Sequence, residues 1–188
     1  MQIYLFIDRD GTIIESPPSP AQIDTLEEVV FLPEVVKWLS KIATELPYKL
    51  VMVTNQNGLG SEEYPEEKFV TVQNYMLDIL ADGEIFFDDI IVDGSYPHEK
   101  SDLRKPRIGR MHKYLADKNV DMKNSFVIGD RLTDIQFAKN LGCKGIFVNP
   151  ENIRGASELT DTIDELKNNY TALASHRWED VYEFLKVL

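Results

Sequence analysis

In Ile3-Tyr4-Leu5-Phe6-Ile7-Asp8-Arg9-Asp10-Gly11-Thr12 an apolar run passes directly into two aspartates and a glycine. An apolar run without alternation is typical of a strand buried on both faces, as in a parallel sheet. Gly11 permits a bend that lets the Asp8 and Asp10 carboxylates point the same way. Two carboxylates at this strand end, joined by a third from elsewhere in the fold, would suit Mg²⁺. An Asp-rich turn also caps helices, and this segment alone leaves both interpretations open.

Four further apolar runs, rich in Val, Ile and Phe, lie at residues 50–53, 90–92, 126–128 and 145–148. Segments with helical periodicity lie between and after them, at 32–42, 69–80, 108–115, 135–141 and 178–188. Gly142 is expected to end the fourth of these helices. The alternation predicts an α/β fold with a doubly wound, mostly parallel sheet. In such sheets ligands bind at the carboxyl ends of the strands, where this sequence has Asp or Thr-Asn.

Composition and charge exclude several classes of function. The 188 residues are 43% hydrophobic and 28% charged, as in a globular rather than a disordered protein. The net charge of −12 argues against a nucleic-acid partner, but not against a small phosphorylated substrate, because a metal and nearby cations set the local field. The sequence has no apolar run of about 18 residues and no signal-peptide pattern, and the lone Cys143 excludes an internal disulfide. We therefore expect a cytoplasmic protein without a membrane partner.

Polar residues that suit phosphate chemistry follow the later strands. Thr54 and Asn55 close the second strand and offer donors to phosphate oxygens, although an ordinary loop cap would look the same. Lys105 precedes the third helical segment and could bridge nucleophile and phosphate as a fixed charge, which most exposed lysines do not do. Asp130 follows the fourth strand and can reach the metal. Asp134, one helical turn later, faces the same way and could orient a metal-bound water.

The order of these motifs resembles the four-part signature of the haloacid dehalogenase superfamily. The parts are Asp-x-Asp-Gly-Thr after the first strand, Thr-Asn after the second, Lys-Pro next, and Gly-Asp-x-x-x-Asp after the fourth. Over nearly its whole length the chain is also similar to the histidinol-phosphate phosphatase domain of the bifunctional histidine-biosynthesis enzyme. The segments that carry this similarity are 4–12, 49–56, 58–60, 104–106 and 127–136.

This resemblance implies a Mg²⁺-dependent phosphomonoesterase that hydrolyses histidinol phosphate to histidinol in histidine biosynthesis. It implies one phosphatase domain over residues 1–188 with little or no cap domain. By position, Asp8 becomes the nucleophile that forms an aspartyl phosphate, and Asp10 becomes the acid and base. The expected Mg²⁺ ligands are Asp8, Asp10 and Asp130, and the expected phosphate contacts are Thr54, Asn55 and Lys105. In that family a dehydratase domain for imidazole-glycerol phosphate follows, so we hypothesise that the natural chain continues past Leu188.

The loop before Lys105 departs from the family pattern. Many relatives hold a structural zinc there with Cys-x-His and Cys-x-Cys, whereas residues 96–103 here retain only His98 at a ligand position. One imidazole cannot hold a tetrahedral site, so we predict that the protein binds no zinc. His98 is then expected to be a surface residue or a substrate contact.

Three other functions stay open. Heptose bisphosphate phosphatases share these motifs, but the Pro-rich segment 16–20 and the overall similarity favour histidinol phosphate, a cationic amino alcohol that would suit an acidic rim including Glu15. The Pro-rich segment itself would be a flap over the site or a plain connector. A receiver-like switch also uses an aspartate cluster on a doubly wound sheet, but it lacks a second aspartate such as Asp10. A catalytically silent domain would not need the full set of acidic and basic residues.

Overall fold

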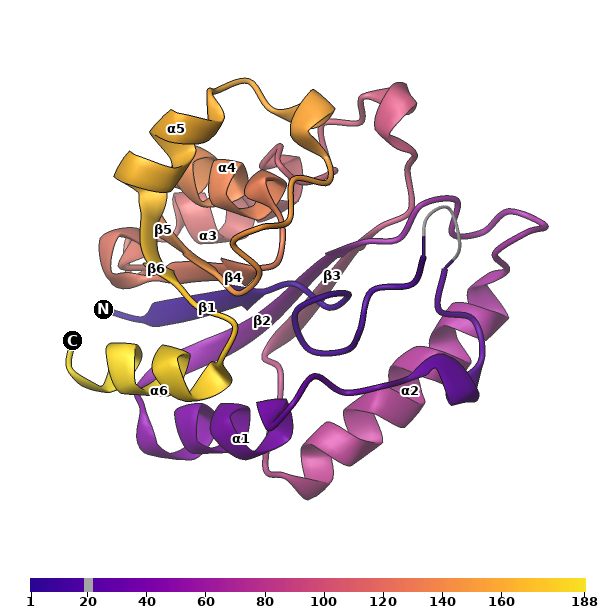
Figure 1. The fold of residues 1–188 in the computed structure, drawn as a ribbon, viewed down its shortest axis with the longest axis horizontal. Helices are drawn as coiled ribbons and strands as arrows, with labels where there is room; N and C mark the ends of the chain where they lie inside the picture. The colour runs from indigo at the N-terminus through magenta and orange to yellow at the C-terminus, as the bar shows by residue number, and fades with distance from the viewer. Residues whose placement is uncertain (19–21) are drawn as a thin grey trace.

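A six-stranded sheet forms the centre of the computed structural model, which describes residues 1–18 and 22–188 (Figure 1). In spatial order the strands are β3 (Asp89–Asp93), β2 (Tyr48–Asn55), β1 (Ile3–Ile7), β4 (Phe126–Gly129), β5 (Lys144–Phe147) and β6 (Thr171–Ala174). Every neighbouring pair is parallel, so the predicted doubly wound sheet is confirmed. The strand order reverses between β1 and β4, which is where sheets of this kind bind ligands.

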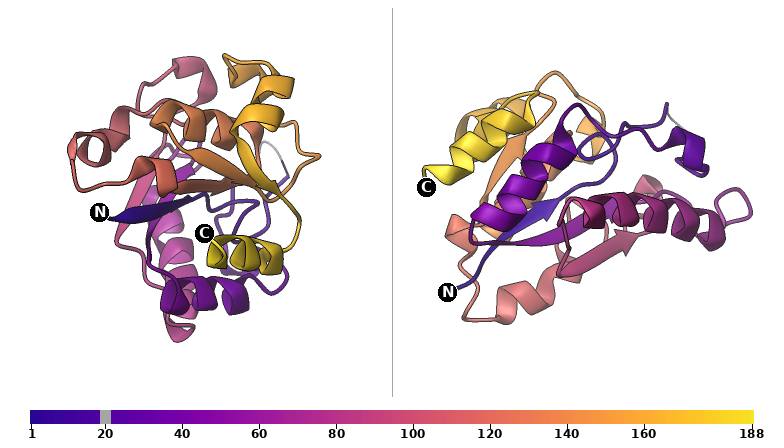
Figure 2. Two further views of the ribbon diagram at one scale, coloured as in Figure 1. Left: turned by 90° about the vertical axis from the view of Figure 1, so that its left-hand side faces the viewer. Right: turned by 90° about the horizontal axis from the view of Figure 1, so that it is seen from below.

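Helices cover both faces of the sheet (Figures 1 and 2). One face carries α1 (Val35–Glu45), α2 (Glu66–Asp82) and α6 (Trp178–Lys186), and the other carries α3 (His112–Ala116), α4 (Leu132–Leu141) and α5 (Ile163–Glu165). The connections contain short 3₁₀ helices and one π-helix. The 3₁₀ helices are η1 (Leu26–Glu28), η2 (Pro97–Glu99), η3 (Gly109–Met111), η4 (Met122–Asn124) and η5 (Ala156–Glu158), and the π-helix is η6 (Leu166–Tyr170). The named strands of residues 1–18 and 22–188 all belong to this one sheet, in agreement with the expected fold with little or no cap domain.

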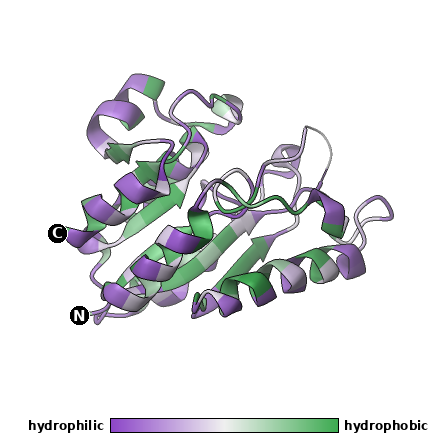
Figure 3. Cartoon of the chain, turned by 60° about the horizontal axis from the view of Figure 1, so that its bottom comes forward, coloured by the Kyte–Doolittle hydropathy of each residue, from purple (hydrophilic) through white to green (hydrophobic). Residues whose placement is uncertain are grey.

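The pleat of the strands sends alternate side chains into two separate cores. Leu5 and Ile7 of β1 pack with residues of α1, α2 and α6, whereas Tyr4 and Phe6 pack with residues of α3 and α4. Figure 3 shows the hydrophobic colour concentrated on the strands and the inner helix faces, with hydrophilic residues on the outer faces. Since β1 is covered on both faces, the polar residues that follow it begin in the interior of the protein.

Some element boundaries differ from the sequence prediction. The segment predicted as one helix at 108–115 is the turn η3 followed by the short α3. Gly109 is a poor helix former, and its N–H donates to the carbonyl oxygen of Asp102 outside the helix. Strand β6 was not predicted, because its four residues are only partly buried and lack a continuous apolar run. The predicted end of α4 is confirmed, since Gly142 follows it with φ 83°.

Two further expectations concern the Pro-rich segment and helices that could span a membrane. Part of the Pro-rich segment 16–20 lies outside the described residues, so its role as flap or connector stays a prediction. In the described parts of the chain, even the longest helix, the 17-residue α2, does not have the length and apolar composition needed to cross a membrane.

Candidate active site

Asp8 lies directly after β1, at the reversal of strand order. Its backbone N–H donates to the carbonyl oxygen of Ile128 in β4 at 2.9 Å, which ties the two strand ends together. The turn that follows requires a glycine, because Gly11 has φ 85° and a Cβ there would collide with the Asp130 carboxylate. The chain therefore bends where the sequence predicts, and the bend leaves room for Asp130 beside Asp8.

Three buried carboxylates meet beside this turn, those of Asp8, Asp130 and Asp134. Asp130 follows β4 and Asp134 lies in the first turn of α4, so two adjacent strands and the start of one helix deliver all three. One oxygen of each carboxylate lies within 4.8 Å of the others. Asp8 and Asp130 meet as the sequence predicts. Asp134 was expected to act through a water, but it lies within the cluster itself.

Lys105 is the cation of this carboxylate cluster. Its Nζ lies 2.9 Å from Asp8 Oδ1 and 2.8 Å from Asp134 Oδ1. Burial lowers the pKa of Lys105, but the two carboxylates outweigh burial and raise the pKa above its ordinary value, so the ammonium stays charged. Arg131 adds a second positive charge, with its Nε 3.7 Å from Asp130 Oδ1, so two cations among three carboxylates leave an excess of negative charge.

The excess of negative charge has its clearest effect on the pKa of Asp130. Burial, reinforced by the carboxylates of Asp8 and Asp134, raises the pKa of Asp130 to about 8. Its Oδ2 accepts a hydrogen bond of 2.7 Å from Asn152 Nδ2, while Oδ1 is buried without a hydrogen-bond partner. A buried carboxylate oxygen without a donor, beside two further carboxylates, is the kind of group that a hard divalent cation satisfies. The donor set therefore fits Mg²⁺.

Asp10 lies in the site but outside the carboxylate cluster. Its Oδ1 accepts from Arg9 Nε at 2.7 Å, and its Oδ2 accepts from Gln56 Nε2 at 2.8 Å and from Arg9 Nη2 at 3.2 Å. The side chain lines the same cleft as Asp8. Its roles as acid and base and as a Mg²⁺ ligand stay predictions.

Thr54 and Asn55, at the end of β2, line the cleft as predicted, but both are already hydrogen-bonded within the protein. Thr54 Oγ1 accepts from Gln56 Nε2 at 2.7 Å, which leaves its hydroxyl hydrogen free to donate. Asn55 makes a reciprocal pair with the backbone of Lys105. Its Nδ2 donates to the Lys105 carbonyl at 3.0 Å, and its Oδ1 accepts from the Lys105 N–H at 3.1 Å. Asn55 therefore positions Lys105, and its predicted contact with phosphate stays a prediction.

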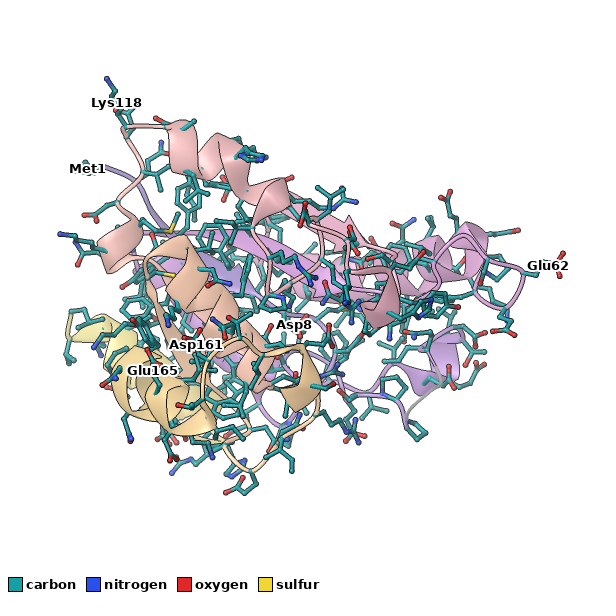
Figure 4. All side chains as sticks on the ribbon, turned by 90° about the horizontal axis from the view of Figure 1, so that it is seen from above. Met1, Asp8, Glu62, Lys118, Asp161 and Glu165 are labelled. Carbon is teal, nitrogen blue, oxygen red and sulfur yellow. The ribbon has the colours of Figure 1, made fainter. Side chains whose placement is uncertain are left out.

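These residues open onto a cleft of about 850 Å³. Figure 4 shows Asp8 in the interior of the molecule, with Glu62 projecting from the loop between β2 and α2. The lining beyond the carboxylate cluster includes both basic and acidic side chains, namely Arg104, Arg131, Arg154, Asp24, Glu28 and Glu63. The volume is in the range of small-ligand sites, and the lining can bind a small molecule that carries both signs of charge.

The loop at 96–103 is held together without cysteines. The His98 ring stacks on Tyr96, with 5.4 Å between the ring centroids. Arg104 anchors the end of the loop, since its guanidinium donates to Asn57 Oδ1, to the Ser95 carbonyl and to Glu158 Oε2. Among residues 1–18 and 22–188, the potential metal ligands that gather in threes are those of the carboxylate cluster. The absence of zinc stays a prediction.

Sequence reasoning missed three residues that shape the site: Arg9, Gln56 and Asn152. Arg9 and Gln56 adjoin predicted residues, and a charged residue between two candidate catalytic aspartates was the available signal. Asn152 lies on the connection between β5 and β6, and no motif surrounds it.

The fold is that of a known class of protein, the haloacid-dehalogenase-like hydrolases. The HAD-hydrolase-like family model matches residues 102–172. Two solved structures share the fold. The D,D-heptose 1,7-bisphosphate phosphatase from B. bronchiseptica, complexed with magnesium and phosphate, has a TM-score of 0.79 and 24% identity, over 100% of this chain and 99% of that chain. A putative HAD-like phosphatase from Mesorhizobium loti has a TM-score of 0.71 and 22% identity, over 99% and 87%.

Within that class, the chain is similar in sequence to the histidine biosynthesis bifunctional protein HisB. The HisB of Bacteroides fragilis is 45% identical over 185 residues, which are 96% of this chain and 46% of that protein. The HisB of Spirosoma linguale is 40% identical over 189 residues, which are 100% of this chain and 49% of that protein. The chain thus spans about half the length of the curated relatives it matches.

Proposed function

We propose that the chain is a Mg²⁺-dependent phosphomonoesterase that hydrolyses histidinol phosphate to histidinol through an aspartyl phosphate on Asp8. One observation carries the proposal: Lys105 Nζ contacts Asp8 and Asp134 inside a buried carboxylate cluster that opens onto a cleft. Phosphoryl transfer depends mainly on positioning and charge stabilisation, and this cluster offers a carboxylate nucleophile beside a fixed cation. The similarity to HisB proteins supports the choice of substrate.

The carboxylate cluster would hold the metal ion, with Asp8, Asp130 and Asp134 as the candidate ligands and Asp10 as a further one. A bound Mg²⁺ would neutralise the repulsion between the attacking carboxylate and the phosphate oxygens. The unpartnered Oδ1 of Asp130 supports this assignment, because a buried acceptor without a donor is otherwise unfavourable.

The reaction would proceed in two in-line steps carried by two aspartates. A carboxylate oxygen of Asp8 attacks phosphorus, the bond to the ester oxygen breaks, and the departing alkoxide takes a proton from Asp10. In the second step a water molecule gives its proton to Asp10 and attacks phosphorus, which releases phosphate and restores the Asp8 carboxylate. Lys105 and the Thr54 hydroxyl would stabilise negative charge on the phosphoryl oxygens.

The charges of the cleft support a substrate with a cationic part. Asp24, Glu28 and Glu63 line the cleft together with the catalytic residues, so an amine bound there would meet carboxylates. Glu15, which we considered for this role, lines a smaller neighbouring hollow that also includes Asp130. The acidic rim is therefore better assigned to the first three residues.

The proposal extends to the full-length protein and its setting. Because the chain spans about half of its HisB relatives, we propose that the natural protein carries a second domain, an imidazole-glycerol-phosphate dehydratase. We place the reaction in the cytoplasm, as the composition of the chain predicts.

The test is phosphate release from a panel of substrates, measured with Mg²⁺ and after removal of metal with EDTA. We expect Mg²⁺-dependent release from histidinol phosphate, with much slower release from D,D-heptose 1,7-bisphosphate. Faster release from the heptose bisphosphate would mean that the proposed substrate is wrong and that the proposed phosphatase reaction is right. A stable phosphoprotein without released phosphate would instead support the receiver-like switch, and a chain that neither binds Mg²⁺ nor releases phosphate would overturn the proposal.

A further inference from the structure

Arg9 is a charged residue that the reaction scheme leaves unused. Among the described residues it is the largest side chain that is completely buried, and it lies between Asp8 and Asp10 in the chain. Its Nε and Nη2 donate to the two oxygens of Asp10, and its Nη1 donates to Gln73 Oε1 at 3.2 Å. The guanidinium also lies 5.2 Å from the centre of the Phe69 ring. Both Gln73 and Phe69 belong to α2, so Arg9 is fixed between the sheet and that helix.

The donors around Asp10 differ between its two oxygens. Oδ2 receives two donors, Gln56 Nε2 and Arg9 Nη2, whereas Oδ1 receives one, Arg9 Nε. A carboxylate oxygen has two acceptor positions, so within the described contacts Oδ2 is saturated and Oδ1 keeps one position free. Since Asp10 lines the cleft, Oδ1 is the oxygen that can exchange a proton with a bound molecule.

Gln56 extends this arrangement to the wall of the cleft. Its Oε1 accepts from Arg9 Nη2 at 2.9 Å and from the Tyr64 hydroxyl at 3.1 Å, while its amide donates to Asp10 and Thr54. Tyr64 lines the cleft from the loop between β2 and α2. Arg9 and Gln56 thus form a buried frame in which neither side chain can rotate without breaking several hydrogen bonds.

We propose that Arg9 is a positioning residue, which together with Gln56 holds the Asp10 carboxylate so that Oδ1 faces the leaving-group oxygen. The inference rests on the proposed function, in which Asp10 moves the proton. A purely structural role would make a different prediction. If the frame only packs α2 against the sheet, its loss would lower stability and would affect all substrates alike.

Substrates with different leaving groups distinguish the positioning role of Arg9 from a purely structural role. An alkoxide leaving group needs a proton during departure, whereas p-nitrophenolate leaves readily without one. The Arg9→Lys variant keeps the positive charge but lacks the planar fork that pairs a separate nitrogen with each Asp10 oxygen. We expect it to lower kcat/KM for histidinol phosphate by about 10–100-fold, because a small misplacement of a catalytic group has effects of that size. For p-nitrophenyl phosphate we expect kcat/KM to change by less than about threefold, since proton donation contributes little there. The ratio kcat/KM reports the step in which the leaving group departs, whereas kcat also includes the second step, in which Asp10 acts on the same aspartyl phosphate for both substrates.

Two further variants make the result interpretable. Asp10→Asn should show the same dependence on leaving group more strongly, and it reports on the proposed function independently of Arg9. Ile42→Val, on the buried face of α1, should lower the melting temperature by about 2–4 °C without touching the site and should leave both kcat/KM values unchanged. Should Arg9→Lys not fold, Gln56→Met removes one donor from Asp10 in a nearly isosteric way and carries the same test.

An equal loss of kcat/KM on both substrates in Arg9→Lys or Gln56→Met, beside a selective loss in Asp10→Asn, would overturn the positioning role while leaving the proposed function intact. If Asp10→Asn itself showed no selectivity, Asp10 would not be the proton donor and the mechanism would fail with it. Wild-type protein that releases no phosphate from either substrate would remove the proposed function itself.

Discussion

At the residue scale, Asp130 shows how a cluster of buried carboxylates lowers the stability of the fold that contains it. Its pKa is raised to about 8 from the ordinary value of 3.8, so between these two pH values the metal-free folded state binds a proton that the unfolded state releases. The stability of the metal-free protein should therefore fall as the pH rises from about 4 to 8, the window between these two values. Deprotonation of Asp130 adds a third negative charge to a cluster that contains one ammonium.

The Asp130→Asn variant should remove that penalty. At pH 8 without metal, we expect its melting temperature to exceed that of the wild type by about 2–4 °C, or roughly 1 kcal/mol for a chain of this size. Mg²⁺ should raise the melting temperature of the wild type but not of the variant, because stabilisation by a ligand requires binding to the folded state. Thermal denaturation with Mg²⁺ and with EDTA measures both effects. A variant less stable than the metal-free wild type at pH 8 would contradict the repulsion we infer.

Cys143 gives a second prediction at this scale. Burial raises the pKa of its thiol to about 12, and the side chain is 5% exposed in the core beneath α4. Thiolate is the reactive form, so the native protein should react with a thiol reagent such as Ellman's reagent only when it unfolds. The reaction rate in native buffer should be far below that in denaturant. Rapid labelling of the folded protein would show that this core opens locally.

The residues of the site could be predicted where chemistry and strand ends coincide. Asp8 and Asp130 were found because each follows an apolar strand, and parallel strands bring their carboxyl ends to one edge. The burial of Arg9 could not be predicted, because a motif does not tell whether a guanidinium faces solvent or the interior. Asn55 was expected to contact phosphate, but its reciprocal pair with the Lys105 backbone depends on how a distant loop packs.

At the scale of elements, the junction between β4 and α4 depends on two glycines in different ways. A Cβ on Gly129 would collide with Asp134, so Gly129→Ala should displace a residue of the carboxylate cluster. A Cβ on Gly142 meets no atom within 4 Å, but its φ of 83° is unfavourable for alanine, at a cost of about 1 kcal/mol. We expect Gly129→Ala to lower kcat at least tenfold, an effect of about 1.4 kcal/mol, and Gly142→Ala to lower only stability. Phosphate release and thermal unfolding of the two variants give the comparison, and full activity in Gly129→Ala would mean that the junction tolerates a shift of Asp134.

The strands and helices could be predicted where their sequences contain a clear apolar pattern. The five predicted strands match β1 to β5. Strands β1, β2, β4 and β5 are largely buried, and the partly exposed edge strand β3 still contains the apolar run Ile90–Val92. The edge strand β6 has residues that are only partly buried, so its sequence carries no such signal. The helix at 108–115 was predicted too long, because periodicity alone does not weigh the glycine at its start.

At the scale of the whole molecule, helix α6 is linked to the turn that follows β1. Trp178 at the start of α6 donates from Nε1 to the carbonyl oxygen of Thr12 at 3.0 Å, across 166 positions of sequence. Trp178→Phe removes this hydrogen bond, because phenylalanine has no side-chain N–H. It also removes part of the packing, because the Trp178 side chain is buried. We expect a loss of roughly 1–3 kcal/mol in the free energy of unfolding, because the Thr12 carbonyl loses its donor. Urea denaturation measures the loss, and unchanged stability would mean that α6 does not hold the turn.

The most direct test of the central claim is phosphate release from histidinol phosphate by this 188-residue chain, compared with its Asp8→Asn variant. The claim is that the buried carboxylates at the β1 and β4 ends, together with Lys105, form a Mg²⁺-dependent phosphatase site with Asp8 as nucleophile. We predict rapid release by the wild type with Mg²⁺, none after EDTA treatment, and none by a variant that is folded to the same extent. Substantial release by Asp8→Asn, or release by the wild type that is indifferent to Mg²⁺, would contradict the claim.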